Sequence, residues 1–405
     1  MTFTFRRRSR AAAWFSAVAL VALVPGAAGA QATQPQLLSH AAPYGSRVEV
    51  TTPAHADAVR AGRQMIADYM ARRGVPGASV AMSIDGRLVW SEGFGLADVE
   101  QGVPVTPSTR FRSGSTAKPM SMAAAAILHD RGQLDFDAVV QDLVPDFPVQ
   151  SRPITFRMLA GMLGGLRHYR LGTDDFFNPR SYDNVLDYVE TFKNDPLIAE
   201  PGTKYSYSSP GTNLQGAMTQ AAGGKPFPIL MQELVFGPLG MVSTTPDWND
   251  SIIPNRTRYY ERTGGRRTYR IRESSWGDGE RGVLLNAPYT DNSNKFPSGG
   301  YLTTPEDLVT FGATMLAPGF YSAETLAELV TVQRTSDGTP TGYGMNWSVE
   351  DKDGELTYSH GGSSVGGNSI LIVFPRHKAV FAMQTNLTDS DLGELPEQLA
   401  GLFLR

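Results

Sequence analysis

The first residues in this sequence that could do covalent chemistry are a serine and a lysine three positions apart. Ser115 and Lys118 begin a stretch, residues 115–131, whose alanine- and methionine-rich composition predicts a helix that ends at Gly132. Residues three apart on a helix share a face, so we expect the Lys118 amine to lie beside the Ser115 hydroxyl. A hydroxyl becomes an effective nucleophile when a nearby base accepts its proton, and burial lowers the pKa of a lysine enough for that role. The pair therefore predicts nucleophilic catalysis by Ser115.

A tyrosine later in the chain could complete the proton transfer. The serine–lysine spacing is weak alone, because a chain with seven lysines contains such a pair by chance in about half of cases. Tyr207, in the sequence Tyr-Ser-Ser ending at Ser209, offers a phenol that could pass the nucleophile's proton to the leaving group. A lone tyrosine in a loop is more often simply half-buried, so the role of Tyr207 depends on the order of the motifs.

A third motif lies ahead of a β-rich run near the C-terminus. It consists of His360, Gly361, Gly362 and Ser363, and residues 369–374 follow it. Small residues on an edge strand let a substrate backbone approach and pair with the strand. The Ser363 amide could then hold the oxyanion together with the Ser115 amide, and one such donor is typically worth ~3 kcal/mol of transition-state stabilisation.

The elements that must position these motifs form two strand pairs and a helical middle. Two β-rich runs, residues 78–84 and 88–94, flank Asp85-Gly86, a strong hairpin signal, and a second pair comprises residues 369–374 and 379–385. Helical spacing marks residues 57–73, 305–315 and 392–404. Strands at both ends predict an α+β fold, in which one antiparallel sheet is flanked by helices and carries an inserted, mostly helical lobe at about residues 113–297.

In their order, the three motifs resemble those of the serine β-lactamase and penicillin-binding superfamily. The sequence is most similar to its class C-like branch, and there to LACTB-type serine β-lactamase-like proteases. Further matching segments are Gly74-Val75-Pro76-Gly77, Trp90-Ser91-Glu92-Gly93, Gly165-Leu166-Arg167-His168-Tyr169, Pro201-Gly202-Thr203-Lys204, Tyr289-Thr290-Asp291-Asn292-Ser293 and Ser298-Gly299-Gly300. The resemblance implies a site between sheet and lobe, an acyl-enzyme on Ser115, and a peptide as substrate.

Three departures from that family pattern bear on the substrate. Ser209 stands where the family usually has an asparagine that contacts substrate, and His360 stands where β-lactamases usually have a lysine. The family's His-x-Ser-Gly segment is replaced by residues 162–165, Met-Leu-Gly-Gly. Serine is shorter than asparagine, and a neutral imidazole offers no fixed positive charge for a substrate carboxylate. These departures predict poor β-lactam hydrolysis and leave acyl transfer to water intact.

The N-terminus predicts export. Four arginines among residues 6–10 precede an apolar run, residues 11–24, and Ala28-Gly29-Ala30 is a typical cleavage site. The apolar run is short for ~30 Å of hydrocarbon, so we expect a cleaved signal peptide rather than an anchor. Residues 1–30 are thus predicted as signal, 31–53 as an extended leader and 54–405 as the hydrolase domain, in the periplasm or outside the cell.

Composition and other motifs narrow the alternatives. A net charge of -4 argues against a nucleic-acid partner, and zero cysteines and the absence of paired histidine motifs argue against a metal or other cofactor. The sequence from Gly362 to Gly366 fits the G-x-S-x-G elbow of α/β-hydrolases, but no strand–helix alternation surrounds it. Arginines and tyrosines in residues 256–272 predict a solvated hairpin rather than a polyanion site.

The reaction class follows from these residues more firmly than the substrate does. Ser115, Lys118 and Tyr207 predict a hydrolase that acts on a peptide or other small substrate. A carboxylic ester hydrolase and a weak β-lactamase or D,D-peptidase stay open, because loops set specificity. A binding or scaffold protein with a vestigial acylatable serine is the non-enzymatic alternative.

Overall fold

The computed structural model describes residues 47–170, 175–262 and 282–404 of the chain. The predicted signal peptide and the centre of the predicted Arg-Tyr hairpin lie outside these ranges. Within them, no helix is both long enough and apolar enough to cross a membrane.

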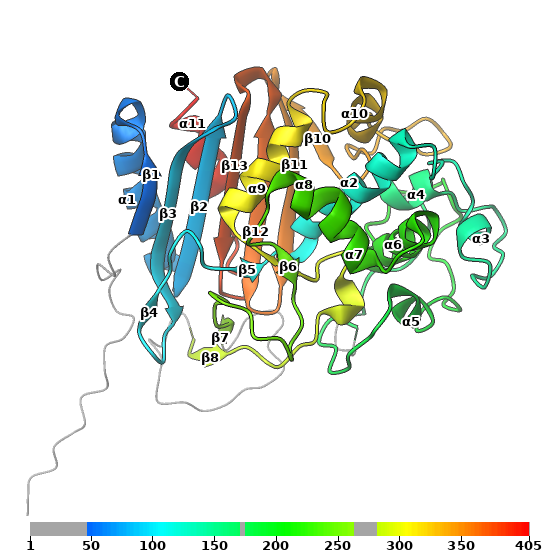
Figure 1. Ribbon diagram of the computed structural model, residues 1–405, viewed down its shortest axis with the longest axis horizontal. Coiled ribbons are helices and arrows are strands. Elements are labelled where there is room, and N and C mark those ends of the chain that lie inside the picture. The colour runs from blue at the N-terminus through cyan, green and yellow to red at the C-terminus, as the bar shows by residue number, and fades with distance from the viewer. Residues whose placement is uncertain (1–46, 171–174, 263–281, 405) are drawn as a thin grey trace, which may run out of the picture. The chain divides into compact units, whose positions relative to one another are not determined.

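One antiparallel sheet organises this part of the chain (Figure 1). Among the described residues its strand order is β1-β3-β2-β13-β12-β11-β10, and β4 pairs with β3. The strands are β1 Arg47–Thr51, β2 Gly77–Ile84, β3 Arg87–Asp98, β4 Val103–Pro104, β10 Ser348–Lys352, β11 Glu355–Ser364, β12 Gly367–Phe374 and β13 Ala379–Thr385. Because β2 pairs with β13, the two predicted strand pairs share one sheet, which confirms that expectation.

Local signals explain the hairpin and the edge of this sheet. Asp85 and Gly86 both have positive φ, 48° and 72°, as the tight turn between β2 and β3 requires. At the edge, β1 pairs with β3, from Arg47 opposite Gly93 to Thr51 opposite Trp90. The end of the predicted extended leader thus contains a strand, β1, whose pairing with β3 has no periodic signal in the sequence.

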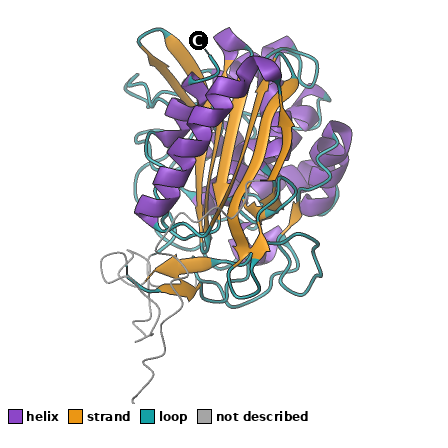
Figure 2. Ribbon diagram, turned by 90° about the vertical axis from the view of Figure 1, so that its left-hand side faces the viewer, coloured by secondary structure: helices purple, strands orange, loops and turns teal. Residues whose placement is uncertain are grey.

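Helices cover both faces of the sheet (Figure 2). On one face, α1 (Ala56–Arg73) and α11 (Leu395–Gly401) pack with Trp90 and Phe381 in a continuous core. On the other face, α9 (Pro305–Gly312) and α2 (Ala117–Asp130) bury a second core with the helical lobe. The final helix is shorter than predicted, because residues 391–394 form a loop in which Asp391 and Gly393 have positive φ.

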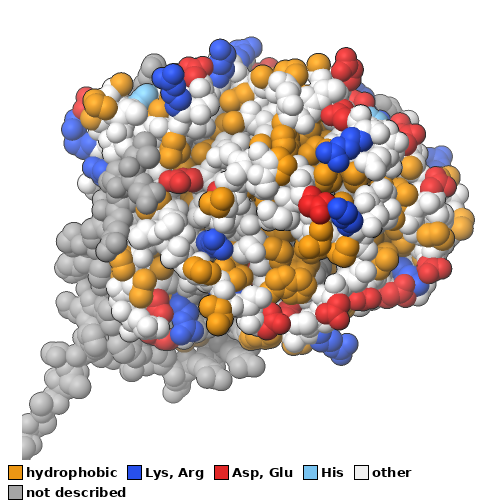
Figure 3. Space-filling model, in the orientation of Figure 1, with side chains coloured by type: hydrophobic (Ala, Val, Ile, Leu, Met, Phe, Trp, Pro, Cys, Tyr) orange, Lys and Arg blue, Asp and Glu red, His pale blue; other side chains and the backbone are white. Residues whose placement is uncertain are grey.

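The helical lobe lies between β5 and β9, as the sequence predicts. Its helices are α3 Val140–Leu143, α4 Phe156–Ala160, α5 Val185–Val189, α6 Ser209–Gly223, α7 Phe227–Met231, the π-helical turn η3 Gln232–Phe236 and α8 Gly237–Leu239. The remaining elements are β5 Phe111–Arg112, β6 Thr245–Pro246, β7 Tyr260–Arg262, β8 Leu284–Asn286, β9 Tyr301–Thr303, α10 Ala323–Val330 and the 3₁₀ turns η1 Pro53–His55, η2 Gly114–Thr116, η4 Ser293–Lys295, η5 Ala313–Met315 and η6 Pro375–His377. On the face seen in Figure 3, basic and acidic side chains are interspersed.

A buried ion pair fixes the strand that leads into Ser115. Arg112 Nε of β5 lies 2.8 Å from Asp247 Oδ2, and both side chains are almost fully buried, with exposed fractions of 3% and 1%. Asn292 Nδ2 donates to the same carboxylate oxygen at 2.7 Å, and Arg112 also donates to the Val365 carbonyl at 2.8 Å. The pair therefore ties β5 to the loop before η4 and to the end of β11.

Replacing Asp247 with alanine should lower the free energy of unfolding by about 3–5 kcal/mol, because the Arg112 charge would remain buried without its partner. Chemical denaturation of the two proteins measures this difference. As a control, Glu233→Ala removes the partner of Lys225 in a half-exposed ion pair. This substitution should lower the free energy of unfolding by less than about 1 kcal/mol. Equal losses in the two variants would contradict the proposed importance of the buried pair.

Candidate active site

Ser115 lies in the 3₁₀ turn η2, directly before α2. The predicted helix therefore begins two residues later than expected, at Ala117, and Gly114 enters the turn with a φ of 50°. Lys118, in the first turn of α2, points back toward the serine, and its Nζ lies 2.9 Å from Ser115 Oγ. The expectation that one helical turn brings the amine beside the hydroxyl is confirmed.

The Lys118 amine has two further partners, both from the helical lobe side. Its Nζ lies 2.9 Å from Ser209 Oγ, at the start of α6, and donates to the Ser298 carbonyl at 3.0 Å. The side chain is fully buried, and burial lowers the pKa of Lys118 well below its ordinary value. A neutral amine can accept a proton from Ser115, whereas an ammonium cannot.

Tyr207 completes this group. The Lys118 Nζ lies 4.8 Å from the centre of the Tyr207 ring, and the Tyr207 hydroxyl interacts with Ser115 and Ser209. Burial raises the pKa of Tyr207 above its ordinary value, so the phenol keeps its proton at neutral pH and can donate it. Tyr205 packs against the Tyr343 ring instead, with ring centres 5.8 Å apart.

Two glycines let β11 approach the nucleophile. A Cβ on Gly362 would lie 2.2 Å from the Ser113 carbonyl oxygen and 3.0 Å from the Ser115 amide nitrogen. A Cβ on Gly114 would lie 2.8 Å from the Ser363 amide nitrogen. Glycine at both positions therefore lets the backbone of Ser363 lie close against the turn that carries Ser115.

The structure differs from the prediction for His360. Its side chain is buried behind the cavity wall rather than lining it, because side chains alternate along β11 and His360 shares the interior side with Gly362. His360 Nδ1 lies 2.7 Å from the Gly361 carbonyl, which can only accept, so Nε2 accepts from the Tyr343 hydroxyl at 2.8 Å. Burial, together with the positive charge that Lys118 carries when it is protonated, lowers the pKa of His360 to about 3, so the imidazole is neutral at neutral pH.

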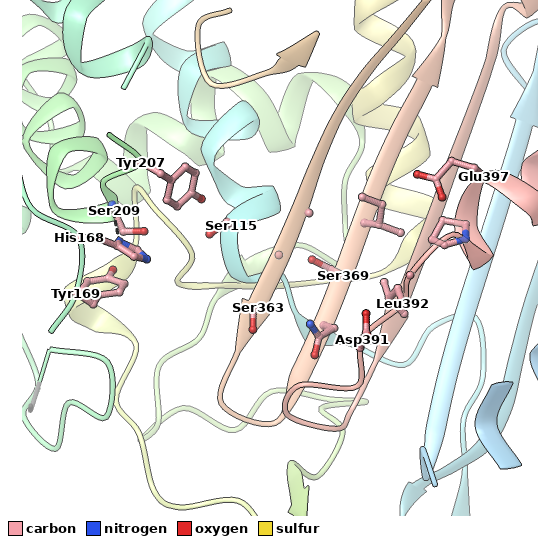
Figure 4. Close-up of a pocket in the computed structure, with 16 residues that line it drawn as sticks. Ser115, His168, Tyr169, Tyr207, Ser209, Ser363, Ser369, Asp391, Leu392 and Glu397 are labelled. Atoms are coloured by element: carbon pink, nitrogen blue, oxygen red, sulfur yellow. Dashed lines mark hydrogen bonds between the residues drawn. The ribbon is translucent and has the colours of Figure 1, made fainter. Parts of the chain in front are cut away.

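The cavity beside Ser115 has a volume of about 410 Å³ and crosses from the lobe to the C-terminal helix (Figure 4). Figure 4 shows Tyr207 and Ser209 on the lobe side of Ser115 and Ser363 on β11 across from them, and Gly361 and Gly362 of β11 also line the cavity. The cavity continues over β12 to the loop before α11 and is lined there by Asn368, Ser369, Ile370, Asp391, Leu392, Gly393, Pro396 and Glu397.

Several of these lining residues carry no signal of a site in the sequence. His168 and Tyr169 lie within a segment that matches the family, but nothing in their local pattern signals a site. The Ser209 amide donates to His168 Nδ1 at 3.2 Å, and the Tyr169 hydroxyl lies 3.0 Å from Ser298 Oγ. The spacing of residues 392–404 predicts a helix, so the sequence does not reveal that the loop before α11 lines the cavity. Within the described residues, no cluster of three metal-ligating side chains is present.

Comparison with known proteins places this site in a family. Residues 63–402 match the family described as Beta-lactamase, so the chain belongs to the beta-lactamase family. The chain is 28% identical to the serine beta-lactamase-like protein LACTB, mitochondrial, of Homo sapiens, over 79% of this chain and 72% of that protein. The predicted superfamily is thus confirmed.

Enzymes with different names also match. The chain is 28% identical to a D-aminopeptidase of Gluconobacter oxydans, over 73% of this chain and 52% of that protein. It is also 28% identical to the esterase EstB of Burkholderia gladioli, over 72% of this chain and 80% of that protein. The fold matches a D-amino acid amidase from Ochrobactrum anthropi, with a TM-score of 0.71 at 21% identity over 86% of this chain and 97% of that chain. The predicted fold class is confirmed.

Replacing Gly362 with alanine should slow labelling of Ser115 by a fluorophosphonate about 100-fold or more, because the added methyl group would push β11 away from η2 and move one oxyanion donor. The control is Gly401→Ala, at the end of α11 and outside the cavity lining, where an added Cβ would meet no atom within 4 Å. We expect that variant to be labelled at close to the wild-type rate. Wild-type labelling of the Gly362 variant would show that the close approach of β11 is not needed.

Proposed function

We propose that this protein is an exported serine hydrolase that forms an acyl-enzyme on Ser115. The observation that carries the proposal is the 2.9 Å contact between the Ser115 hydroxyl and the fully buried amine of Lys118. An amine that burial keeps neutral is a base at neutral pH, and a hydroxyl within hydrogen-bond distance of a base is the arrangement of an activated nucleophile.

Acylation then follows from the residues around this pair. Lys118 Nζ takes the Ser115 proton as Oγ bonds to the substrate carbonyl carbon, and the carbonyl electron pair moves onto oxygen. The amides of Ser115 and Ser363 hold that oxyanion. Tyr207 gives its proton to the leaving group as the bond to carbon breaks, and recovers one from the Lys118 ammonium.

Deacylation uses the same groups in the reverse sense. Water attacks the acyl carbon and gives a proton to the base, and Ser115 leaves with a proton returned to its oxygen. No cofactor takes part in these steps. Each step uses a group that lies against Ser115: the Lys118 amine, the Tyr207 phenol or a backbone amide.

A peptide is the substrate class we favour. Relatives named as a D-aminopeptidase and as an esterase support hydrolysis of amides and esters by this family. A carboxylic ester is therefore the second candidate. A β-lactam or D,D-peptide is a weak third, since His360 is neutral and lies behind the wall, so it offers no charge to a substrate carboxylate. Retention of the site for binding alone is the non-enzymatic alternative.

Location is part of the same proposal. The basic and apolar N-terminal segments and the cleavage site after Ala30 support export to the periplasm or medium. A mature protein that begins at Gln31, read from N-terminal sequencing of the protein secreted by a bacterial host, would support this. Retention of the full chain inside the cell would oppose it.

Ser115→Ala should abolish fluorophosphonate labelling and lower turnover of a short-chain p-nitrophenyl ester and of a preferred peptide by several orders of magnitude. Nitrocefin should be a much poorer substrate of the wild-type protein than either. The control is Ser364→Ala, which removes the serine of the alternative G-x-S-x-G motif and should retain activity. If the wild type is labelled but turns over neither the ester, nor the peptide, nor nitrocefin, the binding alternative is favoured. An active Ser115→Ala variant would refute the mechanism.

The pH dependence of kcat/KM should show a catalytic base whose pKa lies below the ordinary pKa of lysine. Lys118 is active when neutral, so the rate should fall as pH decreases through its lowered pKa. Because the pKa of Tyr207 is raised, loss of the phenol proton should not limit the rate until the pH exceeds the ordinary tyrosine range. A rate that rises only near ~10.4, the pKa of free lysine, would contradict the proposed state of Lys118.

A further inference from the structure

The cavity at Ser115 continues on the far side of β11, and we call this second part the α11 arm. Its lining residues are Gly361 of β11, Ile370 of β12, Leu392 of the loop before α11, and Pro396 and Glu397 of α11. Figure 4 shows Ser115 and Tyr207 on one side of the strand that carries Ser363, and Glu397 on the other. The acylation steps proposed above use no group of this arm.

Gly361 leaves a passage between Ser115 and the α11 arm. Gly361 pairs with Ile370 across the two strands, so a side chain at position 361 would lie beside that of Ile370. A Cβ there would lie 3.8 Å from Ile370 Cδ1 and would meet no atom closer, which is an ordinary van der Waals distance. Among the described residues, β10 pairs with β11 only over residues 355–359 and does not cover this passage. A larger side chain at position 361 would therefore fit the backbone and fill the passage.

The floor of the α11 arm is apolar. Ile370 and Leu392 are half-buried and pack against the core beneath α11, and Pro396 is buried. The polar side chain of Asn368, at the other end of the cavity, accepts a hydrogen bond from the Ser390 amide at 3.0 Å. An apolar group bound in the arm would remove carbon surface from water on both partners, which favours its binding.

Carboxylates surround the outer end of the arm. Burial raises the pKa of Glu397, and the nearby carboxylates of Glu350 and Glu394 raise it further. The charge of Lys352 acts in the opposite direction. Three carboxylates and one ammonium therefore lie together at this end, and a substrate carboxylate that entered it would be repelled.

The position of Tyr207 indicates which part of a substrate enters the α11 arm. In the proposed reaction Tyr207 gives its proton to the leaving group, so that group must lie against the phenol. The Tyr207 ring lies 6.1 Å from the His360 ring, and Gly361 is the next residue of β11. Ser363, the proposed oxyanion donor, lies two residues further along the strand. The leaving group is therefore the part of the substrate beside the passage at Gly361.

We propose that the α11 arm binds the leaving group of the substrate, that it accepts an uncharged apolar group, and that Glu397 disfavours a leaving group with a free carboxylate. For a peptide, the arm holds the residue after the scissile bond and selects against a chain that ends there in a carboxylate. Ile370, Leu392 and Glu397 are then specificity-determining residues. This inference rests on the proposed function of Ser115.

Esters with one acyl group and different phenols test the apolar arm. The leaving groups of p-methylphenyl acetate and p-butylphenyl acetate have nearly equal pKa values, so a difference in kcat/KM reports binding of the alkyl chain. We expect kcat/KM of the wild type to be at least about 10-fold higher for the butyl ester, because its extra methylenes enter the arm. Equal values for the two esters would refute the proposal.

Substitutions in the arm should reduce this preference. In Gly361→Val the new side chain fills the passage, so the butyl-to-methyl ratio of kcat/KM should fall to about 2 or less. Leu392→Ala removes apolar contact without any change in β11, and should also lower the ratio, even if Gly361→Val folds poorly. The matched control is Ile252→Ala, since Ile252 is 99% exposed and lies outside the cavity lining. We expect that variant to keep the wild-type ratio.

The effect of charge needs a second pair of esters, in which the butyl-length chain ends in a carboxylate or in a carboxamide. The wild type should hydrolyse the carboxylate ester with a kcat/KM about 3- to 10-fold lower than that of the carboxamide ester, and added salt should reduce the difference. Glu397→Gln should also reduce it, because it removes one of the repelling charges. A difference that is the same in Glu397→Gln and in the wild type would refute the role of Glu397.

A series of acyl groups tests the orientation of the substrate. If Gly361→Val and Leu392→Ala lower the preference for p-methylphenyl hexanoate over the acetate, and leave the butyl-to-methyl ratio unchanged, the arm binds the acyl group and this inference is wrong. The proposed function would survive that result, since Ser115 would still be the residue that fluorophosphonate labels. If the wild type is neither labelled at Ser115 nor active on any of these esters, the proposed function itself fails.

Discussion

The burial of one amine is the constraint on which the rest of the structure depends. Moving a lysine ammonium out of water is costly, and in proteins the usual response is a lowered pKa rather than a buried charge. Lys118 is enclosed by α2, by Ser209 at the start of α6 and by the loop that carries Ser298. Lobe and sheet must therefore close together around α2 before the amine becomes a base, which links the stability of the fold to the chemistry.

Close backbone contact is the second requirement, and it depends on residues far apart in the sequence. Gly114 and Gly362 let β11 meet η2 at distances that a methyl group would prevent. The buried pair of Arg112 and Asp247 holds the strand that leads into η2, and Arg112 also bonds to the end of β11. The oxyanion site thus depends on a glycine contact and on an ion pair outside the cavity.

Local sequence patterns are sufficient to predict features that depend on a few neighbouring residues. Ser115 and Lys118 are three residues apart where η2 runs into α2, and Asp85-Gly86 specifies a hairpin, so both features could be predicted. His360 could not, because its orientation depends on the phase of β11, which begins at Glu355, and a shift of one residue reverses every side chain. Tyr169 and the 391–394 loop reach the cavity only through tertiary packing, which leaves no periodic signal.

The state of the Lys118 amine is the central claim, and an NMR titration of lysine labelled with carbon-13 at Cε tests it most directly. The chain has seven lysines, and the Lys118 signal can be assigned from its loss in Lys118→Met. The account predicts that this signal titrates well below the exposed lysines and is that of a neutral amine at neutral pH. A Lys118 signal that titrates with the exposed lysines, near ~10.4, would contradict it.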